Sequence, residues 1–340
     1  MLAPILLACG GETVSGSPSD ASADLDMGQA LDSATVDASD SAIPPTRGTS
    51  CRGTPGADRK CGSDQDDCCT TLAVPGGSFL RYYDGLIGTH KDYPATVSSF
   101  YLDKYLVTVG RFRSFVEAYP ASQPKAGDGA HPKIPGSGWD AAWPLPKDIT
   151  ALRAELLQPQ MACRDGNGVD VRTWTDSANT NENLPISCVS WYLLFAFCAW
   201  DRGRLPTDAE WGYAAAGGAE QRVYPWSKEM SYADIDSTRA VFQYFTPPYP
   251  SGPVAVGSKP AGVAKWGHLD LVGNLNEVTV DRVGKPTVPC ADCADLGQLT
   301  NGVDARGGSW MEDHNSLVVI AKGATSADIG AGYVGVRCAR

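Results

Sequence analysis

The segment Arg306–Leu317, with the sequence RGGSWMEDHNSL, carries several side chains that could do chemistry. Its glycine pair permits a close approach of the backbone to a ligand. Glu312, Asp313 and His314 follow Ser309 at short spacing, and their carboxylates, imidazole and hydroxyl are groups used in acid–base catalysis and metal binding. An exposed polar loop without chemistry has the same composition, so both interpretations stay open.

Three N-cap signals predict helices that could frame such a site. The apolar residues after Thr108 recur at helical spacing, and Ser190 precedes a second apolar run. Thr207 and Glu210 form a Thr-x-x-Glu capping box, and the helix that they begin is expected to end before Gly217.

The remaining chain is expected to be rich in loops, because it contains 37 Gly and 24 Pro among 340 residues. Residues 97–107 are β-branched and aromatic and predict one strand, or two with a tight bend. Residues 120–184 have little periodicity and are expected to form an irregular excursion beside a cleft.

The charge pattern argues against a nucleic-acid partner. The net charge is -11, and no run of Lys or Arg indicates a phosphate-binding face. Residues 1–50 hold much of this negative charge, with seven acidic residues against Arg47.

The N-terminal residues 1–9, MLAPILLAC, resemble the lipobox of a bacterial lipoprotein signal peptide, with a small residue before Cys9. The resemblance implies that Cys9 is acylated and that the protein is a lipoprotein of the bacterial cell envelope, at the outer membrane or cell surface. No basic residue precedes the apolar run, so an ordinary apolar terminus is the alternative.

The chain divides into four parts. After residues 1–9 comes a tract of Ser, Asp and Ala over residues 10–50, which is expected to be a disordered acidic tether because it holds no aromatic residue. Residues 51–71 contain four cysteines and predict a disulfide-stapled cap, with a zinc knuckle as the alternative. Residues 72–340 are expected to form one globular domain.

Five stretches of this domain resemble the sulfatase-modifying-factor, or formylglycine-generating-enzyme, family. They are, in order along the chain, VPGGSFL (74–80), SSFYLDKYLVTVGRFRSFV (98–116), CVSWYLLFAFCAWDRGRLPTDAEWGYAAAGG (188–218), GHLDLVGNLNEVTVD (267–281) and RGGSW…GYVGVRCAR (306–340). The resemblance implies an α/β (α+β) domain with little regular structure, described as a variant of the C-type lectin fold.

The family's known reaction oxidises a cysteine of a sulfatase to formylglycine with dioxygen and a copper ion held by two cysteines. The positions of those cysteines are occupied here by Glu312 and Leu317. Copper is therefore not expected, because Cu(I) prefers soft thiolate ligands. The family pattern Gly-Asn-x-Trp-Glu-Trp also loses both indoles, at Asn276 and Val278.

The same resemblance implies a structural calcium site. Asp270, Gly273, Leu275 and Glu277 match the four ligand positions of the family, two through carboxylates and two through backbone carbonyls. Such hard oxygen ligands suit Ca²⁺. An acidic turn without an ion is the alternative.

Cys198 and Cys338 match two family positions that are joined by a disulfide, whereas a buried free thiol is the alternative for Cys198. Without Cys9, ten cysteines remain, an even number that suits five bridges. Cys163 with Cys188 is one candidate pair. Cys290 with Cys293 is another, although a redox-active pair would have the same spacing.

Two functions follow from these observations. In the first, the protein is anchored at the surface, does not generate formylglycine, and binds a protein, peptide or glycan ligand through a lectin-like cleft. In the second, it is an oxidoreductase with altered chemistry that uses Glu312 and its neighbours. Convergence of Glu312, His314 and Arg337 in one pocket would favour the enzyme.

Overall fold

The structure is a computed structural model, and it describes residues 47–52, 60–158, 160–228, 235–244 and 249–340. These residues belong to one compact unit that spans residues 36–340. Cys9 and the tether up to residue 46 lie outside the described residues. None of the described helices is both long and apolar enough to cross a membrane.

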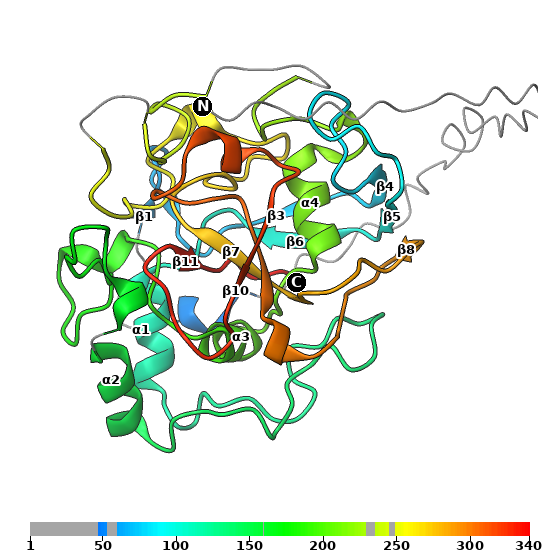
Figure 1. Cartoon of the computed structure of the whole chain (residues 1–340). Helices are drawn as coiled ribbons and strands as arrows, with labels where there is room; N and C mark the ends of the chain where they lie inside the picture. The colour runs from blue at the N-terminus through cyan, green and yellow to red at the C-terminus, as the bar shows by residue number, and fades with distance from the viewer. Residues whose placement is uncertain (1–46, 53–59, 159, 229–234, 245–248) are drawn as a thin grey trace, which may run out of the picture. The chain divides into compact units, whose positions relative to one another are not determined.

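Short helices and strands alternate with long loops (Figure 1). The α-helices are α1 (Val109–Glu117), α2 (Ile149–Leu157), α3 (Trp191–Trp200) and α4 (Asp208–Ala216). The strands are β1 (Lys60–Cys61), β2 (Asp66–Asp67), β3 (Thr71–Val74), β4 (Gly77–Leu80), β5 (Pro94–Val97), β6 (Phe100–Asp103), β7 (Asn276–Arg282), β8 (Cys290–Ala291), β9 (Val303–Arg306), β10 (Lys322–Thr325) and β11 (Val334–Gly335).

The three predicted helix starts are confirmed. The Thr108 hydroxyl accepts a hydrogen bond from Arg111 N, and the Ser190 hydroxyl accepts one from Leu193 N. At α4 both halves of the capping box are present. This helix ends where Gly217 adopts a φ of 68°, a left-handed conformation that costs little at glycine.

A four-stranded sheet, ordered β10-β9-β7-β11, positions the candidate site. Helix α3 lies beside this sheet in Figure 1, and its apolar side chains form one core cluster with Val278 and Val280 of β7. The Trp191 indole also donates a hydrogen bond to Thr279 O at 2.9 Å. Helix α3 is apolar on every side because it is buried on every side.

The excursion over residues 120–184 differs from the prediction in one respect, because it contains helix α2. Asp148 caps this helix by accepting a hydrogen bond from Ala151 N. Leu152 and Leu156 are its buried residues, and two buried positions one turn apart are a weak periodic signal. Elsewhere in the excursion, Trp139 and Trp143 pack against Phe195 of α3.

Disulfides pair all ten cysteines of the described part of the chain. The bridges are Cys51–Cys69, Cys61–Cys68, Cys163–Cys188, Cys198–Cys338 and Cys290–Cys293. The predicted Cys198–Cys338 bridge joins α3 to the C-terminal segment, with a Cα–Cα distance of 5.5 Å. The cap is therefore stapled by two disulfides, and its thiols are not available for a zinc knuckle.

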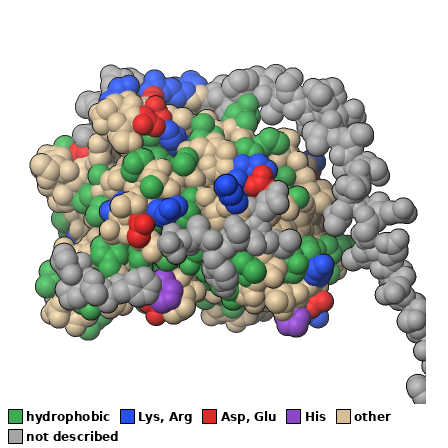
Figure 2. Space-filling view, turned by 90° about the horizontal axis from the view of Figure 1, so that it is seen from above, with side chains coloured by type: hydrophobic (Ala, Val, Ile, Leu, Met, Phe, Trp, Pro, Cys, Tyr) green, Lys and Arg blue, Asp and Glu red, His purple; other side chains and the backbone are tan. Residues whose placement is uncertain are grey.

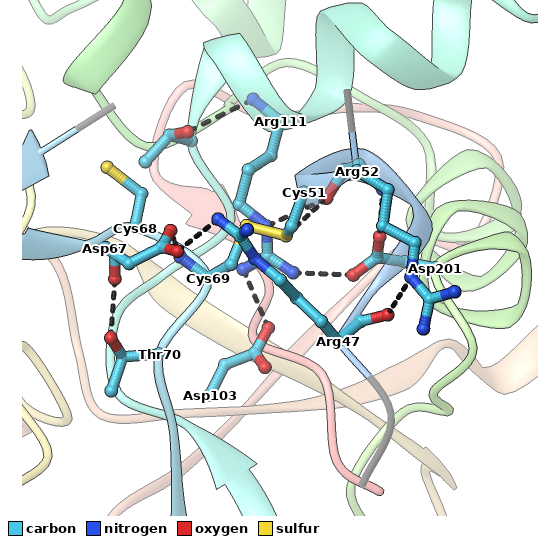
Figure 3. Close-up of a disulfide and its surroundings, with 12 residues drawn as sticks. Arg47, Cys51, Arg52, Asp67, Cys68, Cys69, Thr70, Asp103, Arg111 and Asp201 are labelled. Carbon is cyan, nitrogen blue, oxygen red and sulfur yellow. Dashed lines mark hydrogen bonds and ion pairs between the residues drawn. A yellow bond between two sulfur atoms is a disulfide. The ribbon is translucent and has the colours of Figure 1, made fainter. Parts of the chain in front are cut away.

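The segment just before the cap docks on a buried ion network (Figure 3). Arg111 pairs with Asp103 at 2.8 Å and with Asp201 at 2.7 Å, and the C-terminal Arg340 contacts the same two carboxylates. Ser50 N donates to Asp201 Oδ1 at 2.7 Å. Because all of these carboxylates and guanidinium groups are buried, each charge depends on its partners.

The surface shows no extended field of one charge in the view of Figure 2. On the described part of that face, Lys and Arg side chains are interspersed with acidic and apolar ones.

Candidate functional site

The segment Arg306–Leu317 leaves the sheet at the end of strand β9. Gly307 and Gly308 have φ values of 91° and 68°. A Cβ at Gly307 would lie 2.5 Å from Leu271 O, so this chain reversal requires glycine. The turn carries Ser309 into the interior, where it is fully buried, and leaves Glu312 partly exposed.

Glu312 is held in place by hydrogen bonds from two directions. Its Oε1 accepts a bond from Asn276 Nδ2 at 2.9 Å, and its Oε2 accepts one from Ser309 N at 3.1 Å. Asn276 is fixed in turn, because its Oδ1 accepts a bond from Gly308 N at 3.1 Å. Gln243 N donates to the backbone carbonyl of Glu312 at 2.8 Å. The carboxylate thus has a defined position instead of a free rotamer.

A hollow of about 440 Å³ opens beside this carboxylate. It is bounded by the turn after β9, by the edge strand β10 and by the loop before β11. Its lining residues are Asn276, Ala305, Gly307, Gly308, Glu312, Asn315, Ser316, Ala321, Lys322, Gly323, Ala324, Thr325 and Tyr333. We call it the Glu312 pocket. Amides, hydroxyls, an ammonium group and small residues line much of its wall, so it offers hydrogen-bonding groups beside apolar surface.

The residues proposed from sequence do not all meet in this pocket. His314 does not line it. Arg337 is fully buried and donates two hydrogen bonds to Glu277, at 2.6 and 2.7 Å. Leu317 is also fully buried and belongs to a core cluster with Val272. The convergence of Glu312, His314 and Arg337 that would favour an enzyme is therefore absent from the described structure.

The donor set does not fit copper. The two positions that match the family's copper ligands hold a hydrogen-bonded carboxylate at Glu312 and a core aliphatic side chain at Leu317. Every cysteine of the described residues is already in a disulfide, so no thiolate pair can come from elsewhere in that part of the chain.

Of the residues that match the family's calcium ligands, Asp270, Gly273 and Leu275 lie in the loop before β7, and Glu277 lies at the start of that strand. Asp270 is buried and accepts a hydrogen bond from Gly257 N at 2.6 Å. Burial raises the pKa of Asp270 to about 6, and the nearby charge of Glu277 also raises it. None of the ion pairs in the described part of the chain includes Asp270. The nearby positive charges are those of Arg337, which pairs with Glu277, and of Lys259, which acts on Asp270 without forming an ion pair with it. A bound cation would favour the charged form of Asp270.

Glu277 has fewer free acceptor positions for a cation than Asp270 has. One of its oxygens accepts hydrogen bonds from both Trp211 and Arg337, and the other accepts a further bond from Arg337. A carboxylate has about four acceptor positions, so one remains for an ion. Asp270 and Glu277, with the backbone carbonyls of Gly273 and Leu275, are the groups that would hold Ca²⁺, which would serve here as a structural counter-ion.

A comparison with protein families shows to which family this chain belongs. Residues 58–340 match the sulfatase-modifying factor enzyme 1-like domain. The chain belongs to this family. The match begins inside the cap at residues 51–71.

Relatives in this family include proteins named as inactive. The inactive C-alpha-formylglycine-generating enzyme 2 of Mus musculus is 29% identical over 289 residues, which cover 78% of this chain and 84% of that protein. The formylglycine-generating enzyme of Mus musculus is 28% identical over 308 residues, covering 79% of this chain and 74% of that protein.

A solved structure shows the same fold. The structure of PvdO from Pseudomonas aeruginosa superposes with a TM-score of 0.54 at 19% identity and covers 81% of this chain and 95% of that one. At this identity the likeness concerns the fold alone. It agrees with the predicted α+β formylglycine-generating-enzyme fold.

Asn276, Lys322 and Tyr333 are three of the Glu312-pocket residues that the sequence pattern does not mark as part of a site. Asn276 was noticed only for the indole that it replaces, and Lys322 and Tyr333 were not singled out. They come from β7, β10 and the loop before β11, so no local pattern unites them. One signal in the sequence could have linked Asn276 to Glu312. The first replaces a family indole and the second a family thiol, and paired replacements point to residues in contact.

Proposed function

We propose that this protein is a surface-anchored member of the formylglycine-generating-enzyme family that does not generate formylglycine and instead binds a ligand in the Glu312 pocket. The observation that carries the proposal is the hydrogen bond between Asn276 Nδ2 and Glu312 Oε1 at 2.9 Å. It joins the position of a lost indole to that of a lost copper thiolate. The former reaction site has thus become a fixed polar recognition surface.

The chemistry of the pocket suits a polar ligand. Glu312 keeps acceptor capacity beyond its two bonds, while the Ser316, Thr325 and Tyr333 hydroxyls can both donate and accept. The ammonium of Lys322 is held by Asp304 at 2.6 Å and so presents a fixed donor. A glycan, or a backbone and side chain of a peptide or protein, offers matching groups.

The edge strand β10 provides a second recognition element. It pairs with β9 on one side only and carries Gly323 and Ala324, whose small side chains leave its backbone accessible. An extended ligand segment could add hydrogen bonds along this edge while a side chain enters the pocket. This observation favours a peptide or protein ligand over a glycan.

Ligand arrays test this proposal. Labelled protein would be applied to a glycan array and to an array of extended peptides. Ser316 is exposed on the pocket wall, so a Ser316→Trp variant should fill the pocket without disturbing the core. Ser251 is exposed and does not line the pocket, so Ser251→Trp is the matched control. Binding should be lost in the first variant and kept in the second. Signals unchanged by Ser316→Trp would place recognition elsewhere and contradict the proposal.

The anchor is the second part of the proposal. Three features support an oxidising envelope compartment: a lipobox-like Cys9, an acidic tract without aromatic residues, and five disulfides in the cap and the domain. The acyl chains of a lipoprotein would hold the domain at the membrane surface. Labelling with a fatty-acid probe should be lost in a Cys9→Ala variant; label that persists would exclude this anchor.

A further inference from the structure

A second, larger hollow lies apart from the Glu312 pocket and shares no lining residue with it. Its volume is about 720 Å³, and it lies between helix α2, the start of α3 and the segment around residue 329. Its lining residues are Pro144, Leu145, Pro146, Glu155, Gln158, Gln160, Met161, Ala162, Ser190, Tyr192, Asp328 and Ile329. We call it the Glu155 hollow.

Apolar groups form much of its wall and rim. Met161 is 85% exposed and Ile329 is 54% exposed, while Leu145 is partly buried and Tyr192 is buried. Large apolar side chains that gather at a concave site, instead of scattering singly, indicate a binding surface. Methionine adapts its shape to a partner, and Tyr192 adds a rigid aromatic face.

The charged side chains that line the hollow are both carboxylates. Glu155 is half-buried, and burial raises its pKa, yet its carboxylate takes part in none of the hydrogen bonds or ion pairs found among the described residues. Asp328, which is exposed, adds a second carboxylate from the segment around residue 329. Gln160 Oε1 is buried and accepts no hydrogen bond in the described structure.

No Lys, Arg or His stands among the lining residues to neutralise these carboxylates. A half-buried carboxylate without a cation is costly, and a ligand cation would offset that cost. The apolar wall requires that such a cation arrive on a hydrocarbon stem. The carboxylates and the apolar wall of the hollow therefore both fit a cation carried on a hydrocarbon stem.

We propose that the Glu155 hollow binds an alkylammonium or guanidinium group carried on an apolar stem. The carboxylates of Glu155 and Asp328 accept hydrogen bonds from the cation, and Gln160 Oε1 completes its coordination. Leu145, Met161 and Tyr192 pack along the stem. A Lys or Arg side chain of a bound protein and a free amphiphilic amine share this chemistry.

Fluorescence titration with dansylcadaverine, a primary alkylamine attached to an apolar fluorophore, tests the proposal on the full chain. Its emission should rise and shift to the blue on binding. Glu155→Gln keeps the size of the side chain and removes the charge, and it should weaken binding about tenfold, which corresponds to about 1.4 kcal/mol. Asp328→Asn should weaken binding in the same direction. Glu117 is exposed on α1, outside the hollow, so Glu117→Gln is the matched control and should bind as the wild type does.

Two results would overturn the proposal. One is equal binding of N-acetyl dansylcadaverine, in which the cation has become a neutral amide. The other is an unchanged Kd in Glu155→Gln, provided that its melting curve shows a folded protein. Because no residue of the Glu312 pocket is altered, this test can fail while the proposed ligand binding at that pocket stands, and the reverse also holds.

Competition distinguishes the two sources of the cation. If acetyl-Ala-Lys-Ala-amide displaces the probe at lower concentration than hexylamine does, the hollow recognises a basic side chain of a protein. If hexylamine is the stronger competitor, it recognises a free amine. Failure of both to displace the probe would show that dansylcadaverine binds through its fluorophore alone, which contradicts the proposal.

Discussion

Asn276 Nδ2 donates a hydrogen bond to Glu312 Oε1 across 2.9 Å, although the two residues are 36 positions apart in the chain. Each residue departs from the pattern of its family, the first at an indole position and the second at a copper-thiolate position. The two departures lie in contact, and under the proposed function they form one replacement, in which a hydrogen-bonded polar pair stands where the family has its reaction centre.

A double-mutant cycle on this pair should reveal a coupling free energy. We expect Asn276→Ala and Glu312→Ala each to lower the free energy of unfolding, with a coupling of about 1 to 2 kcal/mol, because the bond has one charged partner and is partly buried. The bond from Ser309 N to Glu312 is lost equally on both sides of the cycle and cancels. Urea unfolding of the four proteins measures the coupling, and a value near zero would show that the contact contributes nothing.

The starts of three helices were predictable from sequence, because each depends only on neighbouring residues. Thr108, Ser190 and Thr207 each precede a helix, and a cap needs only the residues of one turn. Helix α2 was missed because its two buried leucines give little periodicity among so many Pro and Gly residues.

The site was less predictable because its contacts are distant in sequence. Glu312 lines the pocket from the turn after β9, whereas its partner Asn276 belongs to strand β7. Arg337 was considered for the same pocket, but Glu277 occupies its guanidinium group instead. Which partner a charged residue takes depends on burial, and burial is set by the whole fold.

Calcium should stabilise the domain through Asp270. A ligand that binds only the native state adds about 2.7 kcal/mol at a concentration of one hundred times Kd. Asp270→Asn keeps an acceptor for Gly257 N and removes the charge, so it should abolish the effect of calcium without unfolding the protein. A Glu277 variant would be harder to interpret, because it also breaks the pair with Arg337.

Thermal unfolding of wild type and Asp270→Asn, with calcium and with chelator, measures this effect. Asp128 is acidic, exposed and outside the loop, so Asp128→Asn is the control and should respond to calcium as the wild type does. A wild-type melting temperature that is the same with calcium and with chelator would show that this loop holds no calcium.

The buried His268 should make the protein less stable at mildly acidic pH. Burial, together with the charge of Arg337, lowers the pKa of His268 from 6.5 to about 3. Below pH 6.5 the unfolded chain takes up a proton that the folded protein refuses until about pH 3, so stability falls as the pH falls through this window. One proton corresponds to a slope of about 1.4 kcal/mol per pH unit at most.

The slope is measured by urea unfolding between about pH 6.5 and pH 5, above the range in which ordinary carboxylates titrate. Asp270, whose pKa burial raises to about 6, titrates in this window with the opposite sign, so the contribution of His268 is the difference in slope between the wild type and the variant. His268→Gln should reduce the slope of the unfolding free energy against pH by up to about 1.4 kcal/mol per pH unit. This reduction does not depend on how the variant changes stability at pH 7. His90 is exposed, with 87% of its side-chain surface accessible, so His90→Gln should leave the slope unchanged. If the two variants behave alike, His268 is not the origin of the pH dependence.

The protein should not convert a Cys-x-Pro-x-Arg peptide to formylglycine, with or without added copper. The family reaction requires a thiolate pair, and this chain places a hydrogen-bonded carboxylate at Glu312 and a core side chain at Leu317. Mass spectrometry after aerobic incubation measures the outcome, with an active family member as the positive control.

A Glu312→Cys, Leu317→Cys variant sharpens the test. It restores the two thiols and should bind Cu(I), which prefers such ligands. Turnover should still be absent, because Asn276 and Val278 stand where the family has indoles and because a cysteine at position 317 leaves a space in a packed core. Aldehyde formed by the wild-type protein would mean that this chain oxidises thiols by another route. In that case the Asn276–Glu312 pair would have to be reinterpreted as part of a catalytic centre, with Glu312 as its candidate base.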